Sequence, residues 1–349
     1  MNIIKFISYI LCLGALSGNA QASGSDSVSD SYISLALQGD LSQAESLFAG
    51  LNRNTAQASI VELAERFQAR FIDQSEDLSP ATGDAFTDAV VSTYRKYWVL
   101  TLMGNMSKPE GEAFLNASLQ QVISQRGQVE YSNQSSDIFE LVGKIFDDKG
   151  VHYLDAPAPP LRDLFLWRTE QRRNYSVRLT DHTQKVSVTF INDIYSQGWK
   201  QFATLDLVAT TGWVEGDQLY CVDGAYDRSS ENFEVSYLKH ESRHLADFER
   251  FPGLQSADLE YRAKLTELAF ASSSTRQLLD DFTSKSASNP ASPHAYANYR
   301  VSRDVYREMY DKPFPESGNA WQGITTQSVN KAARDLLQRE TKLLQADSK

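Results

Sequence analysis

Apolar side chains recur at helical spacing through the first half of the chain. They repeat every three or four positions in four stretches, and this periodicity predicts helices. The four stretches are residues 60–71, 85–103, 113–123 and 138–146. The second stretch is apolar enough to be mostly buried, but its Asp88, Arg95 and Lys96 rule out a membrane span. The pattern therefore predicts a mainly helical N-terminal domain over residues 23–155.

The period changes after a proline-rich segment. Residues 155–160 include three prolines, which neither a helix nor a central strand accommodates, so we expect a domain boundary here. Beyond it, apolar and polar side chains alternate in residues 175–179 and 186–190. A turn at residues 181–182 separates these two stretches, and together they predict a β-hairpin. Further strand candidates are residues 202–208 and 213–222.

Helical periodicity returns in the C-terminal third. Apolar residues at 233–238 lead into a helix that ends at Phe251-Pro252-Gly253, and a second helix covers residues 256–270. Two further helices are expected, one through Val301 and a last one through Leu336. A small sheet followed by helices indicates an α+β fold. We expect residues 156–349 to form this second domain.

The N-terminal segment has the features of a secretory signal peptide. Lys5 precedes an apolar stretch over residues 6–16, and Ala20-Gln21-Ala22 provides an A-x-A cleavage motif. We therefore expect residues 1–22 to be removed on secretion, and the polar residues 23–30 to be disordered. Cleavage leaves one cysteine, Cys221, which fits a bacterial periplasm better than a disulfide-rich extracellular protein.

Charge and composition narrow the choice of partners. The chain holds 34 Lys and Arg against 45 Asp and Glu, a formal net charge of −11. Such an acidic chain is not expected to bind nucleic acid or an anionic membrane surface. No segment beyond the signal peptide reaches about eighteen uninterrupted apolar residues, so no membrane span is expected.

The clearest chemical signal is His240-Glu241-Ser242-Arg243-His244, an HExxH motif in a predicted helix. Histidines at i and i+4 lie one turn apart on one helix face, so both imidazoles can reach one metal ion. Glu241 lies around the helix from them, where its carboxylate can polarise a metal-bound water. The motif therefore predicts a metal site with Glu241 as general base.

This HExxH helix, followed by a turn and a second helix that supplies a glutamate, resembles the gluzincin branch of the zincin metallopeptidases. The resemblance extends roughly from Tyr237 to Phe270. It implies a zincin-like domain, and a Zn²⁺ ion bound by His240, His244 and a glutamate of the second helix. It also implies a peptide or protein as the substrate.

Two glutamates of the second helix are candidates for the third ligand. Glu260 is preferred, because the ligand of compact gluzincins is commonly followed three residues later by alanine, and Ala263 stands there. The spacing from His244 to Glu260 is shorter than in thermolysin-like members, which leaves Glu267 as the alternative. The two glutamates are seven residues apart, so both lie on one face of the helix.

Other residues near the motif have candidate roles. Asp247 lies on the histidine face, where it can accept a hydrogen bond from a ligand imidazole or else be an ordinary solvated aspartate. Cys221 is a further candidate for the third ligand, because in deformylase-like sites a cysteine precedes the HExxH motif. It is less favoured, since a lone cysteine in an apolar strand is usually a small core residue. Enzymes of this kind usually have a Tyr or His donor for the developing oxyanion. The candidates, among which the spacing does not select, are Tyr261, His294, Tyr296 and Tyr299.

The sequence thus predicts a secreted or periplasmic zinc-dependent metallohydrolase, with a peptidase favoured. Two alternatives are a non-catalytic binding protein with a zincin fold and a zinc hydrolase that acts on a non-peptide substrate. The presence of Glu241 favours an enzyme, because structural zinc has no need of that carboxylate.

Overall fold

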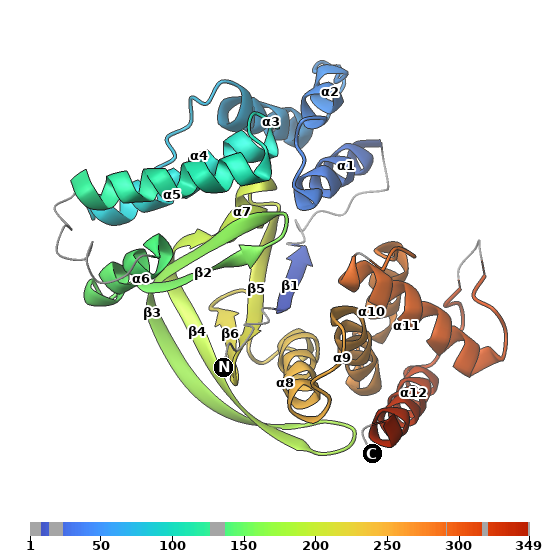
Figure 1. Ribbon diagram of the computed structural model, residues 1–349. Helices are drawn as coiled ribbons and strands as arrows, with labels where there is room; N and C mark the ends of the chain where they lie inside the picture. Colours follow the sequence, from blue (N-terminus) through green and yellow to red (C-terminus); the bar gives the residue numbers. More distant parts are fainter. Residues whose placement is uncertain (1–7, 14–23, 126–136, 291, 316–319, 348–349) are drawn as a thin grey trace. The chain divides into compact units, whose positions relative to one another are not determined.

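The computed structural model describes residues 8–13, 24–125, 137–290, 292–315 and 320–347. Helices and a β-sheet occur in one chain, which confirms the α+β class (Figure 1). The chain divides into two compact units. Unit 1 comprises Met1–Ile10, Gln171–Phe190 and Gly212–Lys349, and unit 2 comprises Leu11–Glu170 and Ile191–Thr211.

Unit 2 contains the helices of the N-terminal half of the chain and one short helix that lies between two strands of the sheet. They are α1 (Gly24–Gln38), α2 (Ala44–Ala49), α3 (Ala58–Phe67), the π-helical η1 (Gln68–Ile72), α4 (Ala85–Leu102), α5 (Lys108–Gln125), α6 (Ile138–Asp148) and α7 (Gly198–Ala203). The four helical stretches predicted from periodicity are confirmed by α3 with η1, α4, α5 and α6. The expected disorder of residues 23–30 is wrong from residue 24 onward, because α1 begins there.

The sheet consists of β1 (Ser8–Leu13), β2 (His152–Ala158), β3 (Leu161–Arg178), β4 (Thr183–Gln197), β5 (Val208–Glu215) and β6 (Gln218–Val222). Its hydrogen-bonded order is β1-β5-β6-β4-β3-β2. The predicted hairpin is confirmed, but its strands β3 and β4 are much longer than expected and run through both units. The strand expected at residues 202–208 is wrong, because α7 and a turn occupy most of it.

The proline-rich segment, where a domain boundary was expected, forms part of the edge strand β2 and its turn into β3. Pro157 lies opposite Arg162 in this antiparallel pairing. A strand at the edge of a sheet tolerates proline, because one side of its backbone has no partner strand to bond. The signal-peptide prediction falls mainly outside the described residues, since only Ser8–Leu13 of that segment is described, as β1.

The C-terminal part of unit 1 is helical. It contains the π-helical η3 (Asn232–Lys239), α8 (His240–Arg250), α9 (Ser256–Phe270), α10 (Thr275–Ser284), α11 (Pro293–Tyr310) and α12 (Thr326–Asp347). The predicted helices are all present, and the apolar segment before the motif is a π-helix that continues into α8. Within the part of the chain that the structure describes, none of the helices has the length and apolar character that a membrane span requires.

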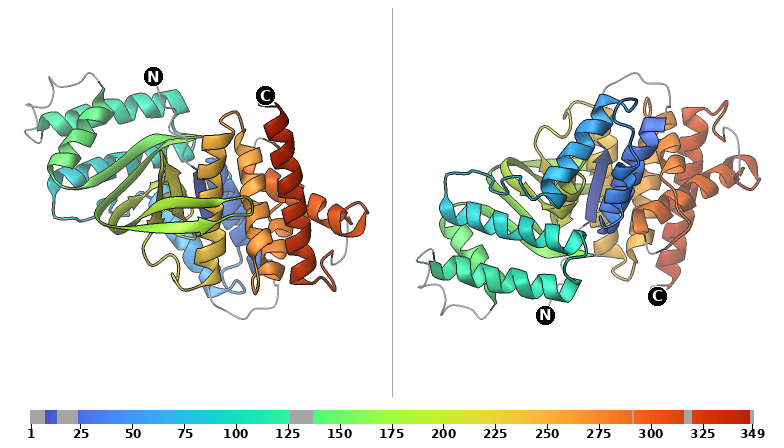
Figure 2. Two further views of the ribbon diagram at one scale, coloured as in Figure 1. Left: turned by 90° about the horizontal axis from the view of Figure 1, so that it is seen from below. Right: turned by 90° about the horizontal axis from the view of Figure 1, so that it is seen from above.

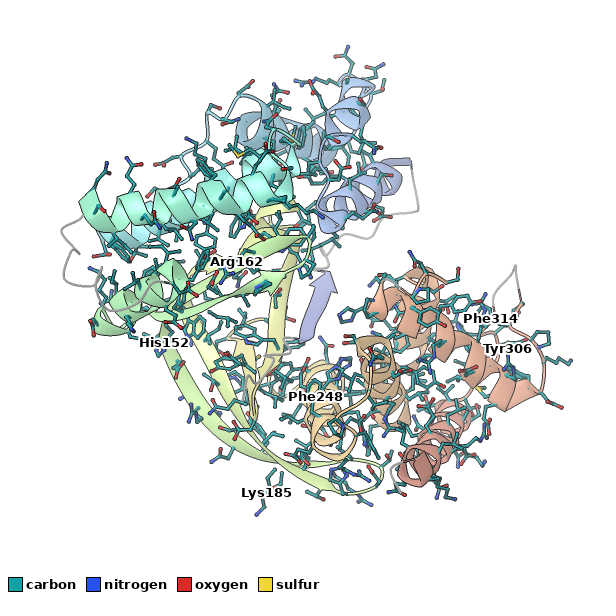
Figure 3. All side chains as sticks on the ribbon, viewed as in Figure 1. His152, Arg162, Lys185, Phe248, Tyr306 and Phe314 are labelled. Carbon is teal, nitrogen blue, oxygen red and sulfur yellow. The ribbon has the colours of Figure 1, made fainter. Side chains whose placement is uncertain are left out.

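Helix α9 is the centre of this helical layer. Figure 2 shows it between α8 and α12, and it also packs against α11. Residues 259–269 are all buried, because neighbouring helices surround α9 on several sides. At one end of the layer Tyr306 lies edge-on to Phe314, and both rings pack against Trp321 (Figure 3). The burial of α9 matters because its charged side chains must find partners inside the protein.

A close approach between β5 and η3 gives a test of this packing. A Cβ atom on Gly212 would lie 2.4 Å from Cε2 of Tyr237 and 2.7 Å from the backbone oxygen of Tyr220. The Tyr237 hydroxyl donates a hydrogen bond of 2.8 Å to that same oxygen, so the ring cannot move without losing it. Gly212→Ala should therefore lower the free energy of unfolding by about 1–3 kcal/mol, measured by urea denaturation.

The control is Gly253→Ala, since a Cβ atom there would meet nothing within 4 Å. It should change the free energy of unfolding by no more than about 0.5 kcal/mol. Equal effects of the two substitutions would show that the contact with Tyr237 is not tight.

Candidate metal centre

Three buried side chains from α8 and α9 converge on one point. The Nε2 atoms of His240 and His244 are 3.1 Å apart. The Glu260 carboxylate lies 3.3 Å from Nε2 of His244 and 3.6 Å from Nε2 of His240. Each of the three residues is at most 3% exposed. This buried group can hold a metal ion.

The spacing and chemistry of the three groups fit an ion. Atoms that bind one zinc ion at about 2.0–2.1 Å in tetrahedral geometry lie about 3.3 Å from one another. The observed separations of 3.1, 3.3 and 3.6 Å are close to that value. Two imidazole nitrogens with one carboxylate oxygen form a ligand set that leaves the fourth tetrahedral position for water.

Glu267 contacts the other nitrogen of the first histidine. Its Oε1 atom lies 2.7 Å from Nδ1 of His240. A proton on Nδ1 that is donated to this carboxylate leaves the Nε2 lone pair available for a metal. The two glutamates considered from the sequence thus have different positions. Glu260 lies beside both Nε2 atoms, where a ligand is needed, whereas Glu267 contacts Nδ1 of His240 and orients that imidazole.

The carboxylates favour a positive charge at this point. Burial by itself lowers the pKa of His240, but the charges of Glu267 and Glu260 outweigh it and raise that pKa to about 10. Burial raises the pKa of Glu260, while His294, His244 and His240 bring it well below its usual range. The group thus stabilises a cation, and a metal ion can take the place of the imidazole proton.

Glu241 differs from these carboxylates, because neither of its oxygens has a hydrogen-bond partner among the described residues. It is fully buried. Burial raises its pKa to about 7, although the neighbouring His244 and His240 act in the opposite direction. A buried carboxyl without a partner lowers stability, so its presence calls for a functional explanation.

Among the four candidates for an oxyanion donor, the structure brings His294 to the metal centre. This first-turn residue of α11 has its Nδ1 atom 2.9 Å from Oε2 of Glu260, and 38% of its side chain is exposed. The Tyr261 hydroxyl instead donates to an aspartate of α11, and the rings of Tyr296 and Tyr299 stack on each other. Spacing along the sequence could not select among these four candidates, because the position of His294 depends on how α11 packs against α9.

Both alternatives for Asp247 are wrong, since its side chain is fully buried. Its two oxygens accept hydrogen bonds from Arg262 at 2.7 and 3.0 Å, and no contact with an imidazole is found among the described residues. The contact with a ligand imidazole that was expected of Asp247 is made by Glu267 instead. Cys221 is buried in β6 and lies outside the ligand group found among the described residues.

Comparisons of the chain with models of protein families, with curated proteins and with solved structures gave no match. The case for a function therefore depends on the geometry and chemistry of this group of residues.

Proposed function

We propose that the protein is a secreted or periplasmic zinc-dependent hydrolase that cleaves peptide bonds, built on a zincin-like domain. One observation carries the proposal. Two histidine Nε2 atoms and a glutamate carboxylate converge at ligand spacing, next to the buried carboxyl group of Glu241, which has no hydrogen-bond partner in the described part of the chain. Structural metal sites have no use for such a carboxyl group, whereas hydrolysis requires one.

The residues divide the work of hydrolysis between them. A zinc ion held by His240, His244 and Glu260 would lower the pKa of a water molecule to about 7 and polarise the scissile carbonyl. Glu241 accepts the proton of the attacking water and passes it to the leaving nitrogen. A pKa of about 7 suits a group that must both take up and release a proton. Glu267 keeps His240 in the tautomer that presents Nε2.

A structural metal site in a zincin-fold binding protein is the second candidate. It is favoured by the burial of the ligands and of Glu241, which are at most 3% exposed. The side chain of His294, which is 38% exposed, links the group to solvent. Both the hydrolase and the binding protein would contain a metal ion, so metal content distinguishes them from a protein without metal. Only the hydrolase would cleave a substrate, so a measurement of activity distinguishes the two candidates from each other.

The first test is the metal content of the purified protein. We expect about one zinc ion per chain, measured by mass spectrometry, because the ligand set is complete. His244→Ala should lose the ion. His152→Ala is the control, since His152 lies in unit 2 beside Trp167 and should leave the content unchanged.

The second part of this test is activity on a mixed peptide library. Cleavage should disappear when a chelator removes the zinc and return when zinc is added back. Zinc binding without peptide cleavage would favour the binding protein or a non-peptide substrate. A wild-type protein that takes up no zinc even after reconstitution would overturn the proposal.

A further inference from the structure

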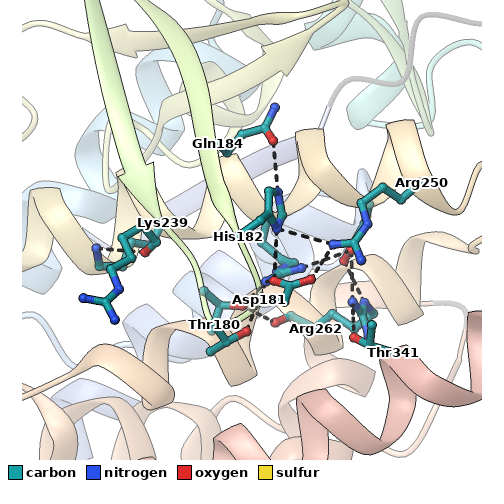
Figure 4. Close-up of polar contacts among 12 residues, drawn as sticks. Thr180, Asp181, His182, Gln184, Lys239, Arg250, Arg262 and Thr341 are labelled. Atoms are coloured by element: carbon teal, nitrogen blue, oxygen red, sulfur yellow. Dashed lines mark hydrogen bonds and ion pairs between the residues drawn. The ribbon is translucent and has the colours of Figure 1, made fainter.

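Close to the metal ligands, charged side chains that are buried or partly buried join the tip of the β3–β4 hairpin to α8, α9 and α12 (Figure 4). We call this cluster the arginine network. Its members are Asp181, Arg243, Asp247, Arg250 and Arg262. None of them is needed to bind a metal or to activate water, so the burial of Arg243, Asp247 and Arg262 requires another explanation.

Arg243 connects three elements from inside the HExxH motif. Its Nη2 atom donates to Oδ1 of Asp181 at 2.7 Å, and its Nε atom donates to the Thr266 hydroxyl of α9 at 3.2 Å. Its Nη1 atom donates to Asp247 of α8 at 3.4 Å. The side chain is 1% exposed. A guanidinium group at this depth is stable only with charged partners in fixed positions.

Asp247 and Arg262 join α8 directly to α9. Both side chains are fully buried, and the guanidinium group donates to the two carboxylate oxygens at 2.7 and 3.0 Å. A forked pair of this kind permits essentially one relative orientation of the two groups. Asp247 follows the ligand His244 by three residues, and Arg262 follows the ligand Glu260 by two. The pair therefore joins α8 to α9 at two positions, each of which lies within one helical turn of a metal ligand on the same helix.

Asp181 anchors the hairpin to the same network. It accepts hydrogen bonds from Arg243 and from Arg250, the last residue of α8. Although partial burial raises the pKa of Asp181, the two guanidinium groups hold it well below its usual range. The Asp181 carboxylate is therefore ionised near neutral pH, and its ion pairs with Arg243 and Arg250 hold the hairpin tip against α8. Arg262 extends the network to α12, where it donates to the Thr341 hydroxyl at 3.2 Å.

We propose that the arginine network positions the metal ligands. By locking α9 to α8, it sets the separation between Glu260 and the two histidines, and so sets the affinity for the metal. This inference rests on the proposed function, because it needs a metal at the site. A network that only stabilised the fold would change the stability of the protein, but neither its metal affinity nor the coordination of the ion.

The test uses the full chain with Arg262→Lys, which keeps the charge and removes the fork. The matched control is Arg70→Lys. Arg70 is a buried arginine of unit 2 that donates to both oxygens of Glu76, at 2.7 and 2.8 Å. For each protein we would measure the dissociation constant of zinc, by competition with a chromophoric chelator. We would also record the visible spectrum of the cobalt-loaded form, which reports ligand geometry.

We expect Arg262→Lys to raise the dissociation constant of zinc by about 10- to 100-fold and to alter the cobalt spectrum. Arg70→Lys should leave both unchanged, although both variants should melt at lower temperature. Asp181→Asn, at the partly exposed hairpin tip, should give a smaller loss of affinity, and it decides the matter if Arg262→Lys does not fold. Wild-type affinity and an unchanged spectrum in the folded variants would overturn the inference and leave the proposed function intact. Absence of zinc binding in the wild type would overturn both.

Discussion

Peptide hydrolysis should fall by about 10²- to 10⁴-fold when Glu241 is replaced by glutamine, which is the usual contribution of a positioned general base. Glutamine has nearly the same shape but cannot accept a proton. The metal ligands are separate side chains, so zinc content should remain at the wild-type level. The measurement is kcat/KM on a peptide that the wild type cleaves, together with zinc content of the same sample.

A control for this substitution lies on the same helix. Glu249 follows Glu241 by two turns of α8 and is exposed to solvent. Glu249→Gln should keep both zinc and activity. Activity of Glu241→Gln close to that of the wild type would show that another group takes the proton. In that case the zinc site could remain, but the assignment of Glu241 would be wrong.

The second large effect concerns stability in the absence of metal. Burial raises the pKa of Glu241 from 4.5 to about 7 in the folded chain. Between pH 4.5 and about pH 7, the folded state therefore keeps a proton on Glu241 that the unfolded state has released. The free energy of unfolding must consequently fall as the pH rises through this range. Glu241→Gln has no such group. Relative to this variant, the wild type should lose about 3 kcal/mol of unfolding free energy between about pH 4 and pH 8.

Urea denaturation in the presence of a chelator, at several pH values across this range, measures the difference between the two proteins. The contribution of the protonated carboxyl is fully present below pH 4.5 and is lost as the pH passes 7. A difference that stays constant with pH would mean that Glu241 is not held in a desolvated position. The exposed Glu249, when changed to glutamine, should produce no such trend.

The part of the site that sequence reasoning found is the part fixed by local geometry. His240 and His244 are one turn apart on any helix, so their convergence follows from the motif alone. The third position depends on how α9 packs against α8. Spacing along α9 left Glu260 and Glu267 on the same face, and the packing places one beside Nε2 and the other beside Nδ1 of His240.

Sequence analysis could not assign the roles of residues whose partners are set by tertiary packing. His294 comes from a helix beyond a loop, and nothing in its neighbourhood distinguishes it from nearby tyrosines. Asp247 lies on the histidine face of α8, which suggested an imidazole as its partner. The buried guanidinium group of Arg262 binds it more strongly, because two charged hydrogen bonds form in parallel.

The sheet was harder to predict than the helices. Residues 168–174 of β3 are all exposed, so this part of the strand lacks the alternation that reveals a half-buried strand. In β2 the prolines suggested a linker, because sequence alone does not show that the strand lies at an edge. At residues 202–208 the apolar residues suggested a strand, and the short α7 and its turn bury them instead.

The π-helical segment before the motif determines where the length of the chain can change. A π-helix accommodates more residues per turn than an α-helix, and such segments occur mostly as local expansions of α-helices. Asn232–Lys239 can therefore be shortened by one residue through conversion to α-helix, without altering the alignment of the flanking segments. A one-residue deletion between His240 and His244 cannot be absorbed in this way, since it would rotate His240 away from His244 by about 100°. Natural variation in chain length should accordingly be tolerated in η3 and excluded from the segment between the two histidines.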